Sequence, residues 1–317
     1  MRREGSPLTG VGVVLAKEAA DYLSGPRMWL LEALVFLTAI GAAYAAILSI
    51  RATIGESPFL FLRLFTMAQD PLPSFISLIG FLIPLVAIAI GFDAVNGEFS
   101  RRTMSRVLAQ PIYRDALLLG KFLAGLLALA IGLVSLWLLV IGLGLLLLGL
   151  PPSGEETIRM AGFFVATLAY GGVWLAMAML FSVVFRAPAT AALAALGMWL
   201  LFALFWSVLT PLVSALVAGP PDTIFGPNLA YLHLSQALDR ISPNTLYAET
   251  ALALLQPATR ALGPVFYSQI QGALLGTPLP AAQSFLLIWP QLTGLVATMI
   301  VIFAIAYIVF QRQEIRA

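Results

Sequence analysis

The dipeptide Gly120-Lys121 is the part of the sequence closest to a nucleotide-binding motif. In a phosphate-binding loop of the form GxxxxGK[ST], backbone amides surround the phosphates, the Lys contacts them, and the Ser or Thr hydroxyl binds Mg²⁺. Here Phe122 follows Lys121, and Asp115 stands where the first glycine would be. We therefore expect no ATP site, and no other cofactor, in this chain.

Metal binding and catalysis are also poorly supported, because His233 is the single histidine and there is no cysteine. Zinc and copper sites draw most of their ligands from these two residue types. We expect His233 to face solvent or to pack against neighbours, and we expect no metal site. No HExxH motif, Ser-His-Asp arrangement or paired-carboxylate pattern is present, so we do not expect an enzyme.

Two carboxylates, Glu32 and Asp93, border apolar runs and are the candidates for ion or proton transport. Ionisable groups deep in a membrane usually mark such pathways. Glu32 stands one turn inside its run and Asp93 at the end of another, and neither has an obvious buried partner in the sequence. We interpret both as interfacial residues, which argues against a proton- or sodium-coupled carrier.

The amino-acid composition indicates whether the protein is surrounded by water or by lipid. Of 317 residues, 61% are hydrophobic and 10% are charged, and the mean hydropathy is +0.98. Soluble domains carry roughly 25% charged residues, so we expect a polytopic membrane protein. The net charge of +2 is too small to suggest nucleic acid binding. The first apolar run is long enough to cross a bilayer, which favours a retained helix over a cleaved signal peptide.

Six runs satisfy the requirement of about 20 apolar residues for a transmembrane helix. The predicted fold is therefore an all-α membrane domain that occupies the whole chain, 1–317. The predicted spans are 28–50, 75–92, 122–150, 160–185, 189–218 and 285–310.

The distribution of Lys and Arg predicts the orientation, because cytoplasmic loops are enriched in both. If the N-terminus is cytoplasmic, twelve of the 17 basic residues lie on that side and five on the other. Both termini are then cytoplasmic, in the cell membrane, as an even number of spans requires. The twelve are Arg2, Arg3, Lys17, Arg27, Arg101, Arg102, Arg106, Arg114, Lys121, Arg186, Arg312 and Arg316.

The loops carry local signals of their own. Ser153 and Glu156 have the spacing of a capping box before the fourth span. Only RAPA separates the fourth and fifth runs, which predicts a tight turn. The external segment 219–284 contains a predicted helix, with Asn244 as a plausible N-cap, and we expect it to cover the outer end of the bundle or dip into the outer leaflet. Its apolar face would comprise Leu246, Ala251, Leu254 and Leu255.

The N-terminal segment 1–27 predicts an amphipathic helix on the cytoplasmic face. An apolar stripe alternates with Lys17, Glu18 and Asp21, and Gly25-Pro26 separates this helix from the first span. The stripe consists of Val11, Val14, Leu15 and Tyr22.

The cytoplasmic segment 93–121 contains a short two-faced helix that Pro111 ends. Met104 lies on the apolar face, opposite Arg106, and a second helix is predicted to start at Tyr113-Arg114-Asp115. One interpretation is a basic anchor for anionic lipid headgroups. The other is a docking element for a cytoplasmic protein, which would also explain the acids, the apolar face and the proline.

This segment resembles the signature of ABC-2 type transporter permeases. The matching residues are Glu98, Arg102-Thr103-Met104, Pro111-Ile112, Arg114 and Leu118-Leu119-Gly120-Lys121. Arg102 replaces the usual glycine and Met104 the usual leucine, while the spacing is kept. The six spans, the N-terminal helix and the tight fourth-to-fifth turn also resemble this family.

The resemblance implies a half-transporter, an exporter, that pairs with a second permease copy or a paralogue. Each permease would bind a separate cytoplasmic ABC ATPase subunit, which holds ATP and Mg²⁺. It implies a coupling helix in 93–121, a connecting helix with Lys17, Glu18 and Asp21, and an external helical hairpin in 219–284 that acts as a gate. The implied coupling residues are Glu98, Arg101, Arg102, Arg106, Pro111, Arg114 and Lys121.

Alternatives remain open from the sequence. A secondary carrier or channel would need a polar site at mid-membrane, and a structural subunit would keep the fold without transporting anything. The substrate is not defined, because apolar spans suit a lipid, a hydrophobic drug or a hydrophobic peptide equally. A role in copper-enzyme maturation is disfavoured by the scattered methionines.

Overall fold

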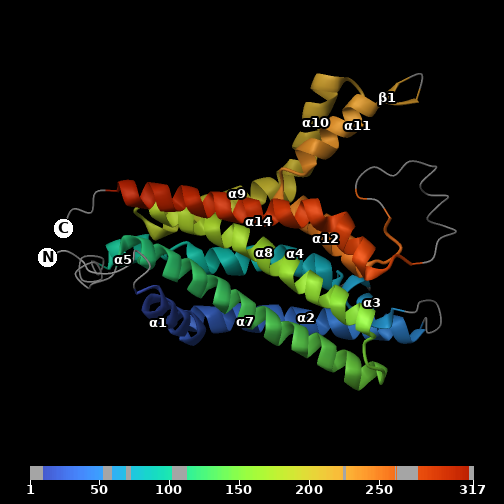
Figure 1. Cartoon of the computed structure of the whole chain (residues 1–317), viewed down its shortest axis with the longest axis horizontal. Coiled ribbons are helices and arrows are strands. Elements are labelled where there is room, and N and C mark those ends of the chain that lie inside the picture. Colours follow the sequence, from blue (N-terminus) through green and yellow to red (C-terminus); the bar gives the residue numbers. More distant parts are fainter. Residues whose placement is uncertain are drawn as a thin grey trace.

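The computed structural model describes residues 10–52, 59–68, 73–101, 113–223, 226–260, 262 and 278–313. These residues form an elongated bundle of helices (Figure 1). The elements are α1 (Val11–Ser24), α2 (Pro26–Ala52), α3 (Leu60–Thr66), α4 (Phe75–Gly91), α5 (Asn96–Ser100), α7 (Arg114–Leu148), α8 (Gly154–Val184), α9 (Pro188–Leu200), the π-helix η1 (Leu201–Phe205), α10 (Trp206–Ala218), β1 (Asp222–Thr223), β2 (Gly226–Pro227), α11 (Leu229–Asp239), α12 (Pro243–Leu255) and α14 (Ala281–Arg312).

The six predicted spans are confirmed. Among the described residues, six helical stretches are long and apolar enough to cross a membrane. They are Pro26–Ile50, Phe75–Ser100, Arg114–Leu148, Gly154–Val184, Pro188–Ala218 and Ala281–Arg312.

The third span begins eight residues earlier than predicted. Tyr113 is the N-cap of α7 and Arg114 its first residue, so the second helix start predicted at this point is correct and runs directly into the span. The 35 residues of α7 extend about 52 Å at 1.5 Å per residue, well beyond the roughly 30 Å of a hydrocarbon core. Lys121 therefore lies within a helix rather than at its start.

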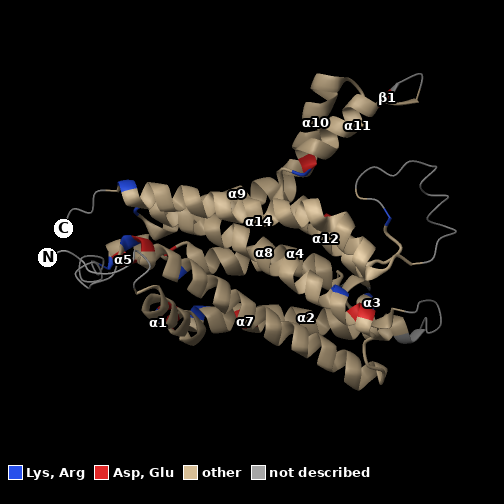
Figure 2. Cartoon of the chain, viewed as in Figure 1, with Lys and Arg blue, Asp and Glu red and all other residues tan. Residues whose placement is uncertain are grey.

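The two ends of the bundle are called the α1 end and the α3 end, after the short helices found there. α1 and the C-terminal end of α14 lie at the same end (Figure 1), as six crossings require. Charged residues concentrate at the two ends and at the base of α10 and α11, and the middle of the bundle is mostly uncharged (Figure 2). This distribution matches a protein whose middle lies in lipid.

Helix α8 forms the centre of the bundle and packs against α14, α4 and α12. Small residues let it approach its neighbours closely. A Cβ on Gly91 of α4 would lie 2.9 Å from the Cβ of Ala178 on α8. Close backbone approach through small residues is the usual basis of helix association in membranes.

An aromatic cluster closes the bundle at the α3 end. Phe65 of α3 packs edge-on against Phe75 of α4 and Phe163 of α8, with ring centroids 5.1 and 5.8 Å apart. Trp137 of α7 lies 5.1 Å from Phe163. Such offset and edge-to-face pairs add stability beyond the buried area, and here they join four helices.

The fifth span does not stay with the bundle along its whole length. After α9 the chain passes through η1, and α10 then projects away from the bundle with α11 packed against it (Figure 1). In α10, only Thr210 and Ser214 are buried. The hairpin formed by α10 and α11 therefore presents mostly apolar side chains to its surroundings.

Helix α12 returns to the bundle and packs on α8 and α14. The four residues predicted for its apolar face are all buried. The predicted N-cap, Asn244, is wrong: Ser242 is the N-cap, and Pro243 takes the first helical position. Proline is favoured there because its missing amide would be unpaired in any case.

Candidate functional site at the α1 end

A buried cluster of three charged side chains joins α1, α5 and α7. The Nζ of Lys121 lies 2.9 Å from Oε1 of Glu18 and 3.5 Å from Oε1 of Glu98. All three residues are at least 93% buried, with relative exposures of 3%, 7% and 7%. The cluster thus links the N-terminal helix to the segment between the second and third spans.

Gly120, next to Lys121, lets α1 lie directly on α7. A Cβ at position 120 would lie 2.7 Å from Cγ1 of Val14 and 3.2 Å from the carbonyl oxygen of Val11. No side chain larger than hydrogen fits there without a shift of α1. Gly120 and Lys121, which do not form a phosphate-binding loop, therefore have structural roles: Gly120 allows the helices to pack closely, and Lys121 belongs to the ion cluster.

The predicted amphipathic helix is confirmed as α1, but its polar residues do not all face solvent. Lys17 contacts Glu18 at 2.9 Å and Asp21 at 3.1 Å, and both Lys17 and Asp21 are exposed. Partial burial lowers the pKa of Lys17, and the carboxylates of Glu18 and Asp21 outweigh this effect and raise it. Burial, together with the charges of Glu18 and Asp93, raises the pKa of Tyr22.

Asp93, which the sequence left without a partner, pairs with Arg27. The guanidinium binds both carboxylate oxygens, with N–O distances of 3.1 and 3.3 Å. It also lies 5.0 Å from the ring centre of Phe92. This two-point contact connects the first turn of α2 to the end of α4, and bidentate Arg–carboxylate pairs fix geometry as well as charge. The other carboxylate, Glu32, lines a cavity of about 30 Å³ between α2, α4 and α7.

The start of α5 is held by the end of α8. The Ser182 hydroxyl accepts hydrogen bonds from the backbone amides of Val95 (3.0 Å) and Asn96 (3.2 Å). The Asn96 side chain donates to the Phe185 carbonyl at 3.1 Å. The predicted tight turn follows at once, since α9 begins at Pro188. Sequence reasoning missed Ser182, because a lone serine in an apolar span carries no signal.

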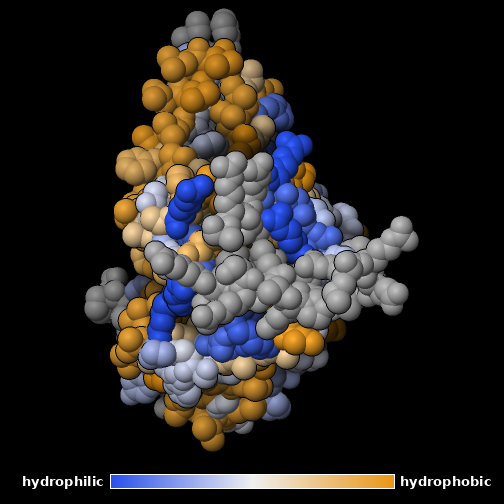
Figure 3. All heavy atoms as spheres, turned by 90° about the vertical axis from the view of Figure 1, so that its left-hand side faces the viewer, coloured by the Kyte–Doolittle hydropathy of each residue, from blue (hydrophilic) through white to orange (hydrophobic). Residues whose placement is uncertain are grey.

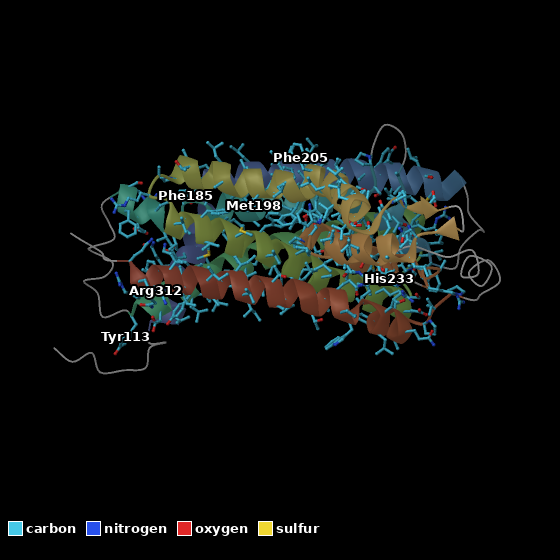
Figure 4. All side chains as sticks on the ribbon, turned by 90° about the horizontal axis from the view of Figure 1, so that it is seen from above. Tyr113, Phe185, Met198, Phe205, His233 and Arg312 are labelled. Carbon is cyan, nitrogen blue, oxygen red and sulfur yellow. The ribbon has the colours of Figure 1, made fainter. Side chains whose placement is uncertain are left out.

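The first turn of α7 contacts the last turn of α14. Arg114 donates to the carbonyl of Gln313 at 3.2 Å and lies over the ring of Phe310. Gln311 donates to the carboxylate of Asp115, and Gln313 donates to the carbonyl of Val183 at 2.6 Å. The ends of α7, α8 and α14 are therefore joined at the same end of the bundle. Figure 4 shows Tyr113, Phe185 and Arg312 gathered there, with His233 toward the opposite end.

Apart from Arg114, the predicted coupling residues that the structure describes differ in burial. Glu98 and Lys121 are buried in the ion cluster, whereas Arg101 is exposed at the end of α5. Arg102, Arg106 and Pro111 lie outside the described residues. The face at the α1 end is rich in hydrophilic residues around its centre, with hydrophobic residues at its rim (Figure 3).

A second buried cation, Arg159, organises the α3 end. It is fully buried, and it donates to the Leu254 carbonyl and the Ser284 hydroxyl at 3.0 Å each. It also donates to the Glu155 carboxylate at 3.1 Å. The neighbouring capping box of Ser153 and Glu156 is confirmed. From the sequence, Arg159 was counted only as a charge on the outer side. Its role in joining α8 to α12 and α14 was missed.

A polar contact also connects α12 to the middle of the bundle. The hydroxyl oxygen of Tyr170 lies 2.9 Å from the Gly80 carbonyl oxygen and 2.8 Å from Oδ1 of Asn244, and its one proton is shared between these two acceptors. Its ring stacks on Tyr247 with centroids 4.4 Å apart. Asn244 thus bonds to α8 instead of capping its own helix. In the described part of the chain, no group of three or more His, Asp or Glu side chains is placed to hold a metal ion.

Six apolar spans, with a polar cluster that ties the N-terminal helix to the loop between spans two and three, define a multi-pass membrane protein. The profile of the family described as "ABC-2 family transporter protein" matches residues 13–315. The chain belongs to this family and is an ABC transporter permease.

Two curated relatives are similar to part of the chain. Both are described as "Probable ABC transporter permease protein NosY". The protein from Pseudomonas aeruginosa is 33% identical over 175 residues, which cover 53% of this chain and 58% of the relative. The protein from Stutzerimonas stutzeri is 28% identical over 169 residues, with the same two shares. The chain thus matches somewhat more than half the length of these relatives.

Proposed function

We propose that this chain forms the translocation pathway of an ATP-driven exporter, as one of two permease subunits. A separate ABC ATPase subunit would bind ATP and Mg²⁺ and dock at the α1 end. That end would face the cytoplasm, in the cell membrane, as the distribution of Lys and Arg predicts. Family membership and the six spans support the proposal.

The observation that carries the proposal is the buried cluster of Glu18, Lys121 and Glu98. A helix at the surface can transmit movement only if it is rigidly attached to the helices that must move. The cluster attaches α5 to α7 and α1, and the hydrogen bond from the Val95 amide to Ser182 attaches the start of α5 to α8. A displacement of α5 by the ATPase would therefore reach α1, α7 and α8 together.

This arrangement assigns two different roles to the predicted coupling residues. The exposed Arg101 would contact the ATPase, together with Arg102 and Arg106 of the adjoining segment. Glu98 and Lys121 would act behind that surface as positioning residues, since they are too buried to reach a docked protein. Contact and transmission should then be separable by mutation.

The test is to co-express and co-purify the chain with its ABC ATPase subunit. Arg101→Glu should lower the amount of ATPase recovered, whereas Arg260→Glu at the α3 end should not. Lys121→Met should leave recovery unchanged but lower the ATPase rate stimulated by the permease. If Arg101→Glu and Lys121→Met both leave recovery and stimulated rate unchanged, the α1 end is not the coupling site.

A further inference from the structure

A cavity of about 580 Å³ lies where the fifth span leaves the bundle, toward the α3 end. This volume falls within the range of roughly 300–1,000 Å³ that is typical of small-molecule sites. Its wall combines residues of α4, η1, α10, α11 and α12 with the last residue of α3. The cavity is distinct from the ion cluster, which lies at the other end of the bundle.

One wall of the cavity is aromatic and held in place. Phe202, in η1, and Trp206, the first residue of α10, have ring centroids 4.9 Å apart. The indole Nε1 of Trp206 donates to the Leu238 carbonyl at 3.0 Å, which fixes the ring against α11. π-Helical turns are rare in proteins overall, and those that occur are often found at functional sites. Here the π-helix η1 supplies Phe202 and Ala203 to the wall.

Another part of the lining is polar and carries negative charge. The described lining residues include the carboxylates of Asp239 and Glu249, and no Lys or Arg. Glu249 is already neutralised by Arg240, at 3.1 Å, and accepts a hydrogen bond from Gln291 at 2.9 Å. Asp239 accepts a hydrogen bond from the Thr210 hydroxyl at 2.6 Å, and no Lys or Arg of the described residues pairs with it. One negative charge at the cavity is therefore uncompensated.

We propose that this cavity binds an amphipathic organic cation, with its positive centre near Asp239 and its apolar groups against Phe202 and Trp206. Charge complementarity selects a cation, because an anion would meet a carboxylate without a balancing lysine or arginine. The aromatic faces also favour a diffuse cation over a neutral molecule of the same size. The cavity thereby gives the substrate class of the exporter, a step that rests on the proposed function, while binding itself needs no ATPase.

Two lipophilic ions of the same shape and opposite charge test the inference. The complete chain is placed in nanodiscs of neutral lipid, and binding of tetraphenylphosphonium and tetraphenylborate is measured by equilibrium dialysis, with empty nanodiscs subtracted. Saturable binding of the cation alone is expected. Saturable binding of tetraphenylborate with equal affinity would overturn the inference, because the cavity would then select apolar bulk only.

The variants isolate the contribution of one carboxylate. Asp239→Asn should raise the Kd for tetraphenylphosphonium about tenfold, the equivalent of one charge-assisted contact. The asparagine keeps an oxygen that can accept the Thr210 hydrogen bond, so the fold is preserved. Asp239→Glu should restore binding, and the exposed Asp222→Asn, on β1, should leave it unchanged.

An unchanged Kd in Asp239→Asn would overturn the assignment. Trp206→Leu provides a second measurement and should also weaken the binding of the cation. Because no ATPase is present, failure of cation binding leaves the coupling experiment with Arg101 and Lys121 intact. Conversely, binding that depends on Asp239 would stand even if that coupling experiment failed.

Discussion

Replacement of Lys121 by methionine removes the only cation in contact with both Glu18 and Glu98 among the described residues. Methionine keeps most of the apolar stem of lysine, so the change deletes charge with little loss of packing. Two carboxylates, each about 7% exposed, would then share a site without the amine that holds them together. We expect α1 to separate from α7 more often.

The size of the effect follows from burial. Removing one partner of a buried ion pair costs about 3–5 kcal/mol, since the other charge stays desolvated. Glu18 retains Lys17 at 2.9 Å, which places the loss near the lower limit, about 3 kcal/mol. At about 1.4 kcal/mol per factor of ten, the opening of α1 should become roughly 150-fold more frequent.

Hydrogen–deuterium exchange of the α1 backbone amides measures this opening directly, because local exchange reports the free energy of local separation. The chain in nanodiscs is compared with Lys121→Met under identical conditions. Lys17→Met is the matched control, since it removes a lysine at the same 2.9 Å from Glu18, but one whose side chain is 59% exposed. Exposed pairs contribute about 0–1 kcal/mol, so its exchange should change about fivefold at most.

Equal exchange in Lys121→Met and Lys17→Met would refute the reasoning, because burial would then not determine the energy of the cluster. Unchanged exchange in Lys121→Met would refute it as well. A double variant, Glu18→Gln with Lys121→Met, should recover part of the loss, since it removes one of the two buried carboxylate charges.

Two further predictions concern packing and the second buried cation. Gly120→Ala should weaken the attachment of α1 by about 1–3 kcal/mol, because the new methyl group would overlap with Val14, and the α1 amides should then exchange faster. Gly142→Ala, where the space is open, should leave the exchange of α1 unchanged. Arg159→Met should cost about 1–3 kcal/mol for each buried acceptor left unpaired, such as the Leu254 carbonyl, seen as a lower midpoint of thermal unfolding in detergent. The exposed Arg186→Met should stay within about 0.5 kcal/mol.

The spans could be predicted from the sequence because their signal is one-dimensional. Length and hydropathy identify a membrane helix without knowledge of its neighbours. The capping box at Ser153 and the helix break at Gly25-Pro26 were likewise predictable, since each depends on residues a few positions apart. The same locality explains why the second helix start near Tyr113 was found correctly.

The pairings inside the site could not be predicted, because they join residues that are distant in sequence. Lys121 meets Glu18 across 103 positions (121 minus 18), and nothing local distinguishes that partner from Asp21. Asn244 was assigned a local role, but its side chain accepts a hydrogen bond from Tyr170 of α8 instead. A polar residue near a helix start can satisfy its own helix or another, and tertiary packing makes the choice.

The bend of the fifth span was also beyond the sequence reading. Hydropathy identifies the run 189–218 as one span but does not report where a helix bends. After the π-turn η1, Trp206 and Thr210 of α10 bond to α11, and α11 lies outside this run. The cavity is lined by residues of several elements that are far apart in the sequence, which is why no candidate ligand site emerged from the sequence.

The burial of Arg159 has a consequence for how the protein is made. Its partner Ser284 follows 125 residues later in the chain, a delay of about 6–25 s at a synthesis rate of ~5–20 residues per second. During the first part of that interval, Glu155 of the same helix is available to the guanidinium, but the Leu254 carbonyl and the Ser284 hydroxyl are not yet made. The burial of Arg159 is thus completed only when α12 and α14 have been made, so the packing of α8 depends on segments that are synthesised later.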